Sequence, residues 1–181
     1  MRGRRPGILA TMVTLRVLTT DDWPLWRELR LAALTDAPQA FKVRLADWDR
    51  GEQERWRARL AMPGAHHLAA LLDDGRPVGM ASGLAGDGGV TELRSVWVDS
   101  GARGHGIGGR LIAAVEARAR EAGAVGLRLA VLAGNEPAIA LYRRHGFDFV
   151  DGPAGKAGPA RDAAAVAQRA EYVMAKALRT G

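Results

Sequence analysis

The sequence predicts an α/β protein, with an α+β arrangement in which a central mixed, mostly antiparallel sheet of about seven strands is flanked by about four helices. Apolar residues recur with a period near 3.6 in some segments and near 2 in others, in the order β-α-α-β-β-β-α-β-α-β-β. Residues 90–132 read as strand, helix, strand, a unit whose two strands run parallel. Short turns rich in aspartate and glycine join the strands before it, which predicts antiparallel neighbours there.

Each expected element has a local signal. Thr20, Asp21 and Asp22 form a helix-start signal, and the helix that follows breaks at Pro38. Gly123 suits the end of the long central helix, whose start is expected just after the glycine-rich segment described below. We expect strands at residues 14–18, 67–72, 77–84, 90–98, 126–132, 147–150 and 171–178. We expect helices between the signals at 22 and 36, and at residues 52–61, 110–122 and 135–146.

Composition limits the classes of function. The chain carries a formal net charge of +6 and no cysteine, which excludes disulfides and thiolate ligands. Basic residues are scattered along the chain, so we do not expect a nucleic acid partner. We expect no metal site, because the adjacent residues His66 and His67 point to opposite sides of a strand. No apolar run reaches the length of a membrane span, so we expect no membrane partner and a cytoplasmic protein.

The chain length suits a single domain. We expect residues 1–13 to form a flexible N-terminal extension and residues 14–181 to form one domain. The extension begins with several arginines and a short apolar stretch that leads directly into the first strand. The sequence leaves open whether translation starts at Met1 or Met12.

The most informative segment is a glycine-rich stretch between the strand 90–98 and the next helix. It consists of Arg103, Gly104, His105, Gly106, Ile107, Gly108 and Gly109. Glycine lets backbone N–H groups approach a ligand closely, and a helix N-terminus adds unpaired N–H groups and partial positive charge. Together these features predict a phosphate-binding loop.

Three other interpretations of this loop fit less well. Gly104, Gly106 and Gly109 satisfy a dinucleotide-binding pattern, but residues 99–103 separate them from the strand, and no acidic residue ends the next strand. A Walker-type loop requires a Gly-Lys-Ser/Thr sequence, which is absent. A glycine-rich turn that binds nothing is the remaining alternative.

Two segments together resemble the GNAT N-acetyltransferase superfamily. Residues 103–108, read as Arg-x-x-Gly-x-Gly, resemble its pyrophosphate-binding loop. Residues 135–147 resemble its Asn-x-x-Ala-x-x-x-Tyr-x-x-x-Gly-Phe segment. The order of elements over residues 14–150 is similar too, and the closing strand 171–178 also fits. The resemblance implies an N-acetyltransferase that uses acetyl-CoA as the acyl donor and no metal.

The resemblance also implies how the cofactor is held. In the family, the strand before the loop separates from its parallel neighbour, and the pantetheine arm inserts between them. By this resemblance the backbone of Val96, Trp97 and Val98 pairs with the arm, and the Val96 amide polarises the thioester oxygen. The side chains of Val96 and Val98 are expected in the core. Asn135 would cap its helix and bond the arm or nearby backbone, although capping alone explains its presence.

Two catalytic residues follow from the resemblance. Tyr142 matches a tyrosine beside the cofactor sulfur, where a phenol donates a proton to the departing thiolate; the alternative is a core aromatic residue. Glu92 matches a glutamate that deprotonates the amine in some members; the alternatives are a surface glutamate and a water relay. Six residues separate Glu92 from Val98, so we expect both side chains on the same face of the strand. A carboxylate among apolar neighbours suits a base, because desolvation raises its affinity for a proton.

The acceptor is less well specified. We expect residues 20–65 and 151–170 to contact it, with one or two of the tryptophans at 23, 26, 48 and 56 lining an apolar pocket. The resemblance implies an unidentified primary amine on a small molecule or a protein, and homodimers are frequent in the family. An acyl donor other than acetyl-CoA stays open. Two other functions also stay open: a non-catalytic acyl-CoA-binding sensor, and a toxin that acetylates aminoacyl-tRNA.

Overall fold

The computed structural model describes residues 12–41, 53–150 and 171–178. Within these ranges the chain forms seven strands and four α-helices in the predicted order, which confirms the predicted fold class. The strands are β1 (Thr14–Val17), β2 (His66–Leu71), β3 (Pro77–Ala85), β4 (Val90–Val98), β5 (Gly126–Leu132), β6 (Asp148–Phe149) and β7 (Glu171–Ala177). The helices are α1 (Trp23–Asp36), α2 (Gln53–Leu60), α3 (Ile107–Glu121) and α4 (Glu136–Arg144).

Three expectations lie outside the described residues: the extension over 1–11, the loop 151–170, and the part played by Trp48. The last two residues of the predicted extension are described and contact the folded domain. The Met12 amide donates to Asp73 Oδ2 at 3.1 Å, and Val13 packs against the core. No helix in the described part of the chain has the length and apolar character that a membrane span needs.

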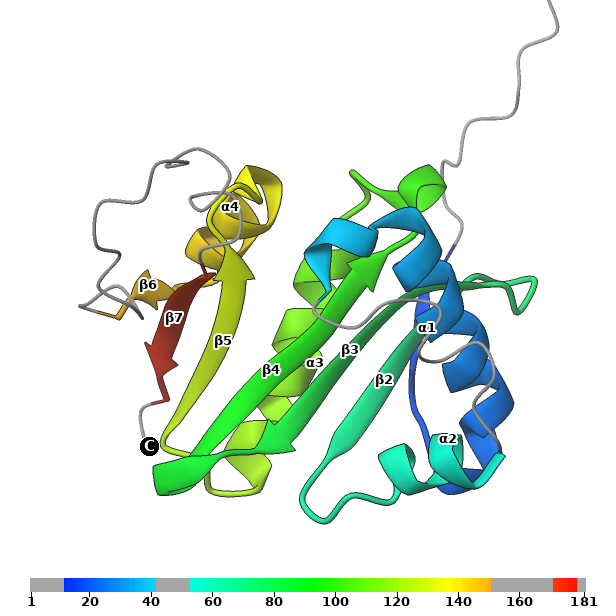
Figure 1. Ribbon diagram of the computed structural model, residues 1–181, viewed down its shortest axis with the longest axis horizontal. Helices are drawn as coiled ribbons and strands as arrows, with labels where there is room; N and C mark the ends of the chain where they lie inside the picture. Colours follow the sequence, from blue (N-terminus) through cyan, green and yellow to red (C-terminus); the bar gives the residue numbers. More distant parts are fainter. Residues whose placement is uncertain (1–11, 42–52, 151–170, 179–181) are drawn as a thin grey trace, which may run out of the picture.

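One sheet contains all seven strands, in the order β1-β2-β3-β4-β5-β7-β6. Every neighbouring pair is antiparallel except β4 and β5, which are parallel, as the strand-helix-strand unit predicts. Figure 1 shows β4 and β5 side by side at one end and diverging toward the other. The sheet is therefore divided into an N-terminal part, β1 to β4, and a C-terminal part, β5 to β7.

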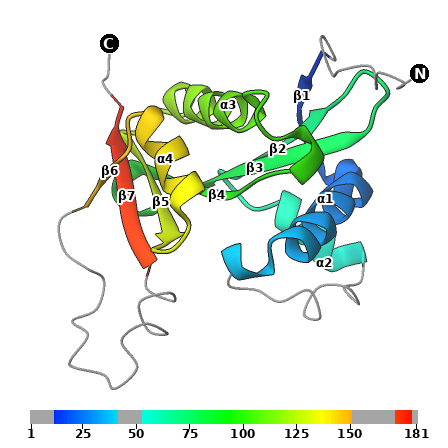
Figure 2. The ribbon, with the colours of Figure 1, turned by 90° about the horizontal axis from the view of Figure 1, so that it is seen from above.

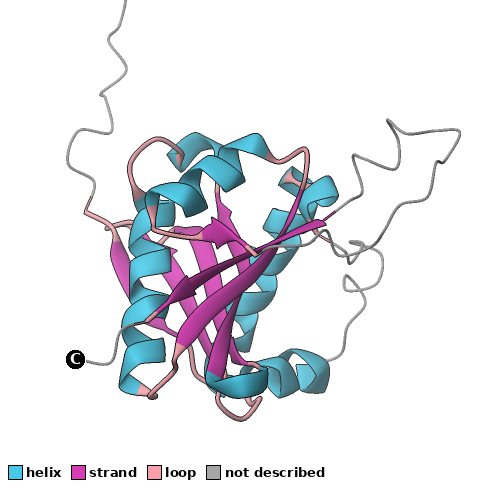
Figure 3. Cartoon of the chain, turned by 90° about the vertical axis from the view of Figure 1, so that its left-hand side faces the viewer, coloured by secondary structure: helices cyan, strands magenta, loops and turns pink. Residues whose placement is uncertain are grey.

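Helices cover both faces of this sheet (Figures 2 and 3). The first face carries α3 and α4, and its core, which we call the α3-side core, includes Leu111, Val115 and Tyr142. The second face carries α1 and α2, and its core, the α1-side core, includes Trp26, Trp56 and Trp97. Because each helix places apolar residues at helical spacing toward the sheet, burial of these side chains holds the three layers together.

The predicted bounds of β4 and β5 are confirmed, but the central helix begins earlier than expected. It starts at Ile107 instead of residue 110, with Gly106 as its N-cap. Gly106 has a left-handed backbone conformation, with φ of 75°, which glycine adopts without steric penalty. Residues 107–109 therefore belong to the first turn of α3 and not to the loop before it.

Candidate functional site

The parallel contact between β4 and β5 ends after three residue pairs. Val90, Thr91 and Glu92 pair with residues of β5, and Glu92, opposite Arg128, is the last of them. Beyond this pair, residues 93–98 of β4 have antiparallel partners only on β3. A strand edge in this state presents backbone N–H and C=O groups to whatever enters between the diverging strands.

A β-bulge interrupts β4 where the strands diverge. Met80 pairs with Trp97 and Ser82 with Arg94, so Ala81 faces the two residues Ser95 and Val96. Ser95 is the one described non-glycine residue with positive φ, at 57°. A bulge of this kind reorients the backbone of the bulged strand and leaves one residue unpaired. The backbone at Ser95 and Val96 is therefore exposed at the point where β4 has lost its neighbour.

The bulge changes which side chains share a face. Val96 and Val98 pack against the α3-side core, as expected, whereas Trp97 lies in the α1-side core. Glu92 pairs with Leu84, which alternates in β3 with Met80, the partner of Trp97. Glu92 therefore shares the face of Trp97, and the prediction that it shares the face of Val98 is wrong, because the extra residue at Ser95 inverts the alternation.

Glu92 is held by an ion pair. Its Oε1 accepts from Arg128 Nε at 2.7 Å and lies 2.5 Å from Arg128 Nη2. No described residue bonds to Oε2. The carboxylate thus has a cationic partner where the sequence suggested apolar surroundings, and its second oxygen is open on the α1 face of the sheet. Its role as a base stays a prediction.

The glycine-rich loop presents free backbone donors. No described residue accepts a hydrogen bond from the amides of Gly104, His105 or Gly106. Gly104 and Gly106 both have positive φ, and a Cβ on either would meet no atom within 4 Å. The first turn of α3 adds N–H groups that lack acceptors within the helix. This arrangement fits an anion such as a pyrophosphate.

Gly108 and Gly109 have a second reason to be glycine. A Cβ on Gly108 would lie 3.1 Å from Leu141, and one on Gly109 would lie 2.8 Å from His145 Nε2. Both glycines thus permit α3 to approach α4 and the residue that ends it. The close approach places the end of the loop beside α4, which carries Tyr142.

Arg103 is engaged by the protein itself. Its guanidinium forms an ion pair with Asp36 at the end of α1, and its Nε donates to the carbonyl oxygen of Val98 at 3.0 Å. The indole N–H of Trp97 donates to the same carboxylate oxygen of Asp36 at 3.0 Å. These bonds tie the end of α1 to the end of β4. Whether Arg103 also contacts a cofactor stays a prediction.

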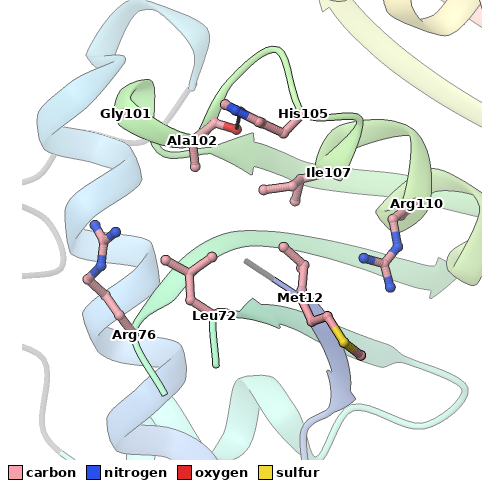
Figure 4. Close-up of a pocket in the computed structure, with 9 residues that line it drawn as sticks. Met12, Leu72, Arg76, Gly101, Ala102, His105, Ile107 and Arg110 are labelled. Atoms are coloured by element: carbon pink, nitrogen blue, oxygen red, sulfur yellow. Dashed lines mark hydrogen bonds between the residues drawn. The ribbon is translucent and has the colours of Figure 1, made fainter. Parts of the chain in front are cut away.

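A hollow of about 260 Å³ lies beside the loop, between α3 and the β2–β3 turn (Figure 4). His105 and Ile107 contribute to it from the loop and helix, Met12 and Leu72 from the opposite wall. The ring of His105 folds back on the loop, with Nδ1 3.2 Å from the carbonyl oxygen of Ala102. Arg76 and Arg110 also line this hollow and make it basic.

Tyr142 and Asn135 occupy α4 and its start. Tyr142 is buried in the α3-side core, and its ring meets the edge of Phe147 at a centroid distance of 5.9 Å. Burial raises the pKa of Tyr142 to about 12. No described residue bonds the Tyr142 hydroxyl. Asn135 caps α4, since its Oδ1 accepts from the Ala138 amide at 3.4 Å.

Residues 23–147 match the profile of the Acetyltransferase (GNAT) family. The chain belongs to this family of acetyltransferases. The match spans both helices of the α1 face, the diverging strands, the loop and α4, so the GNAT family assignment rests on the elements that build the site.

Individual relatives agree with the family. A mycothiol acetyltransferase of Clavibacter sepedonicus is 34% identical over 135 residues, which are 75% of this chain but only 42% of that protein. The structure of a ribosomal-protein-alanine N-acetyltransferase of Brucella melitensis is 28% identical, with a TM-score of 0.66 over 91% of this chain and 99% of that one. The PaiA N-acetyltransferase of Thermoplasma acidophilum, solved in complex with coenzyme A, shares the fold at 17% identity, with a TM-score of 0.68 over 92% and 99% of the two chains.

Several residues at this GNAT site had no signal in the sequence. Ser95 carries no glycine or proline mark of a bulge, and Asp36 and Arg128 are distant in sequence from their partners Arg103 and Glu92. In the part of the chain that the structure describes, no three His, Cys, Asp or Glu side chains gather into a possible metal site. The expected separation of His66 and His67 is confirmed, since His67 contacts Trp26 under α1 while His66 lies near α3.

His67 is a buried neutral residue on the α1 face. Its Nε2 lies 3.1 Å from the carbonyl oxygen of Arg59 and its Nδ1 2.8 Å from Ser82 Oγ. Because a carbonyl oxygen only accepts, Nε2–H donates to it, and Nδ1 accepts from the serine hydroxyl. Burial, followed by the positive charge of Arg59, lowers the pKa of His67 from 6.5 to about 4.

This pKa shift predicts a pH dependence of stability. Between pH 6.5 and pH 4 the unfolded chain binds a proton at His67 and the folded chain does not, so folding stability falls as the pH is lowered through this window. We expect His67 to contribute a loss of about 3 kcal/mol in the free energy of unfolding between pH 7 and pH 4. Urea unfolding of the wild type and of His67→Gln at both pH values measures the contribution. Equal pH dependence in the two proteins would contradict it.

Proposed function

We propose that the chain catalyses acetyl-CoA-dependent acetylation of a primary amine on a small molecule or a protein, by direct attack in a ternary complex. The observation that carries the proposal is the bulge at Ser95 and Val96, located where β4 loses its parallel neighbour and next to a loop of unpaired amides. The chain spans less than half the length of its mycothiol acetyltransferase relative, so that protein's substrate is not transferred to it.

The residues of the site fit an acyl-CoA. The amides of Gly104, His105 and Gly106 with the first turn of α3 suit its pyrophosphate, and the basic hollow lined by Arg76 and Arg110 suits its nucleotide end. The free edge of β4 suits the amide-containing pantetheine arm, since an extended ligand with amides can pair with a strand edge. Bound acetyl-CoA supplies the acetyl group and leaves as the thiol.

The chain's own groups would stabilise the reacting carbonyl. Val96 follows the bulge, where the backbone N–H is not committed to a parallel partner strand. A fixed N–H that is aimed at a developing negative charge stabilises it without reorganisation. We assign this role to the Val96 amide, with the backbone of Trp97 and Val98 positioning the rest of the arm.

Tyr142 is suited to donate a proton to the departing thiolate. A phenol is protonated at neutral pH, and burial raises the pKa of Tyr142 further, so it can give a proton to a departing thiolate but cannot act as a base there. No described residue bonds its hydroxyl, which leaves the group available to a ligand that enters between α4 and the diverging strands.

Glu92 is suited to accept the proton of the amine through intervening water. Four residues of extended chain separate it from Val96, roughly 12 Å, which is too far for direct contact with an amine at the bulge. Its Oε2 is open on the α1 face while Arg128 holds Oε1 in place. A water chain from the amine to this oxygen would carry the proton away.

Calorimetric titration with acetyl-CoA tests the cofactor assignment. We expect micromolar binding of acetyl-CoA and none of NADH or ATP at the same concentrations. Gly106→Ala should lower the affinity for acetyl-CoA at least tenfold, because the methyl group occupies the open space of the loop. Binding of NADH alone would contradict the proposal.

The matched control for this substitution is Gly123→Ala. Gly123 has φ of 76° and an equally open Cβ position but lies beyond the other end of α3. Both substitutions should destabilise the fold by about 1–2 kcal/mol through backbone strain. Only Gly106→Ala should weaken acetyl-CoA binding; an equal effect of the two on affinity would show that strain, not the loop, is responsible.

Tyr142→Phe tests the proton donor. We expect kcat to fall about 100-fold while the affinity for acetyl-CoA stays unchanged, because only the hydroxyl is lost. Steady-state release of free thiol with a saturating amine measures the rate. Tyr172→Phe, on the exposed face of β7, is the control and should leave kcat unchanged. Unaltered turnover in Tyr142→Phe would remove the assigned role.

Glu92→Gln tests the base. We expect kcat to fall throughout the pH–rate profile, because the group that accepts the amine proton is gone. The profile of kcat between pH 5 and pH 9 is the measurement, with acetyl-CoA affinity as a check that the fold persists. A profile identical to that of the wild type would assign proton removal to another group.

A further inference from the structure

Three arginines gather on the α1 face of the sheet, outside the cofactor loop. They are Arg30 of α1, Arg59 of α2 and Arg94 of β4. Burial, followed by the charge of Arg59, lowers the pKa of Arg30 to about 10, and burial, followed by the charge of Arg94, lowers the pKa of Arg59. Packing places them on one face, since α1 and α2 contact each other there, and Arg94 pairs with Ser82, which is two residues from Met80 of the α1-side core. Arg94 is exposed, Arg59 is half-buried and Arg30 is 8% exposed.

No described carboxylate neutralises these three charges. Two described carboxylates, Asp36 and Glu92, form ion pairs with other arginines: Asp36 with Arg103 and Glu92 with Arg128. Arg30 makes one hydrogen bond among the described residues, from Nη1 to Ser95 Oγ at 2.9 Å, and its guanidinium stacks on Phe41 at 4.9 Å from the ring centroid. A buried guanidinium usually has an anionic partner, because removing its charge from water is unfavourable.

Arg30 has guanidinium donors without an acceptor among the described residues, since Nη1 makes its one hydrogen bond there, to Ser95 Oγ. A nine-tenths buried arginine with unused donors is suited to bind an anion that the described part of the chain does not supply.

Arg30 adjoins the reaction centre of the proposed function. The residue that Arg30 contacts is Ser95, which forms the bulge with Val96. Arg94 precedes the bulge and shares its face of the sheet with Trp97. An anion held by these arginines would therefore lie within a few side-chain lengths of an amine directed at the Val96 amide.

We propose that the acceptor is an amine that also carries an anionic group near its amino group, and that Arg30, Arg59 and Arg94 bind that group. A carboxylate matches the fork of a guanidinium best, since both are planar and can form two parallel hydrogen bonds. An α-amino acid is the simplest molecule with this chemistry, and a phosphate monoester on a short amine offers the same charge. The inference rests on the proposed function for its acceptor but not for its anion site.

Matched acceptors test the substrate class. Amino acids, their carboxamides and their decarboxylated amines are compared, for example leucine, leucinamide and isoamylamine, together with phosphoethanolamine and ethanolamine. Thiol release from acetyl-CoA gives kcat/KM for each. We expect kcat/KM to be at least tenfold higher for the acid than for its amide. A preference for phosphoethanolamine over ethanolamine, with no preference for acids over amides, would assign the site to phosphate instead of carboxylate. Equal use of acids and amides, together with equal use of phosphoethanolamine and ethanolamine, would overturn the proposal.

Substitution of the arginines locates the site. Arg94→Gln and Arg59→Gln should reduce the preference for acid over amide toward one, mainly by raising KM for the acid, while the affinity for acetyl-CoA stays the same. Arg118→Gln removes an exposed arginine from α3 on the other face of the sheet and should keep the full preference. An unchanged preference in both site variants would overturn the assignment.

A binding measurement separates the two proposals. Side-chain NMR of the arginine Nε–H groups is recorded with N-acetyl-leucine and with N-acetyl-leucinamide, without acetyl-CoA. We expect only the acid to shift arginine signals, and we expect the signals that shift to be missing or unmoved in Arg94→Gln. Such shifts in a protein that neither binds nor uses acetyl-CoA would refute the proposed function and keep the anion site. Acetyl transfer without any acid-specific shift would refute the anion site and keep the function.

Discussion

The separation of β4 from β5 is the constraint on which the rest of this structure depends. Three residue pairs join the strands, and the Glu92–Arg128 ion pair lies at the last of them. Beyond it the backbone of β4 needs a partner that the sheet does not provide, because unpaired backbone groups are unfavourable when shielded from water. The bulge at Ser95 lies in the part of β4 beyond the last pair, the loop before α3 follows the end of that strand, and α4, which carries Tyr142, follows β5 (Figure 1). One break in a parallel pair thus creates a place for an extended, amide-containing ligand.

Positive charge lies on both sides of the place where β4 and β5 separate. On the loop side, backbone N–H groups and the arginines of the hollow present positive potential. On the α1 face, Arg30, Arg59 and Arg94 form a second positive region. Asp36 is occupied by Arg103 and Trp97 at the end of β4, where it links α1 to the strand. Glu92, on the α1 face, is likewise held in an ion pair with Arg128.

The sequence predicts the fold well, because the residues that each helix or strand buries recur with that element's period along the chain. The bounds of β4 and β5 follow from apolar runs between glycine-rich turns, and their parallel pairing follows from the helix between them. The family follows from the loop and from the segment that carries Asn135 and Tyr142. Each of these features lies within a short stretch of sequence.

Features that arise from contacts between distant residues could not be predicted. Ser95 has no residue-type signal for positive φ, so the inverted alternation after Glu92 was hidden. The sequence groups Gly108 and Gly109 with the loop, whereas α3 includes both and packs at them against Leu141 and His145. The three arginines are separated by about 30 residues each and meet only because α1 and α2 pack on the same face as Arg94. Their convergence is a property of the topology.

Hydrogen–deuterium exchange with and without acetyl-CoA tests most directly whether the parting of β4 and β5 holds the cofactor. Peptides that cover residues 93–98 and 103–108 should exchange more slowly in the presence of acetyl-CoA, because their free backbone donors become bonded. Peptides from β1 and β2 should exchange at the same rate in both conditions. Bound acetyl-CoA that protects other segments and leaves 93–98 and 103–108 unchanged would contradict the account.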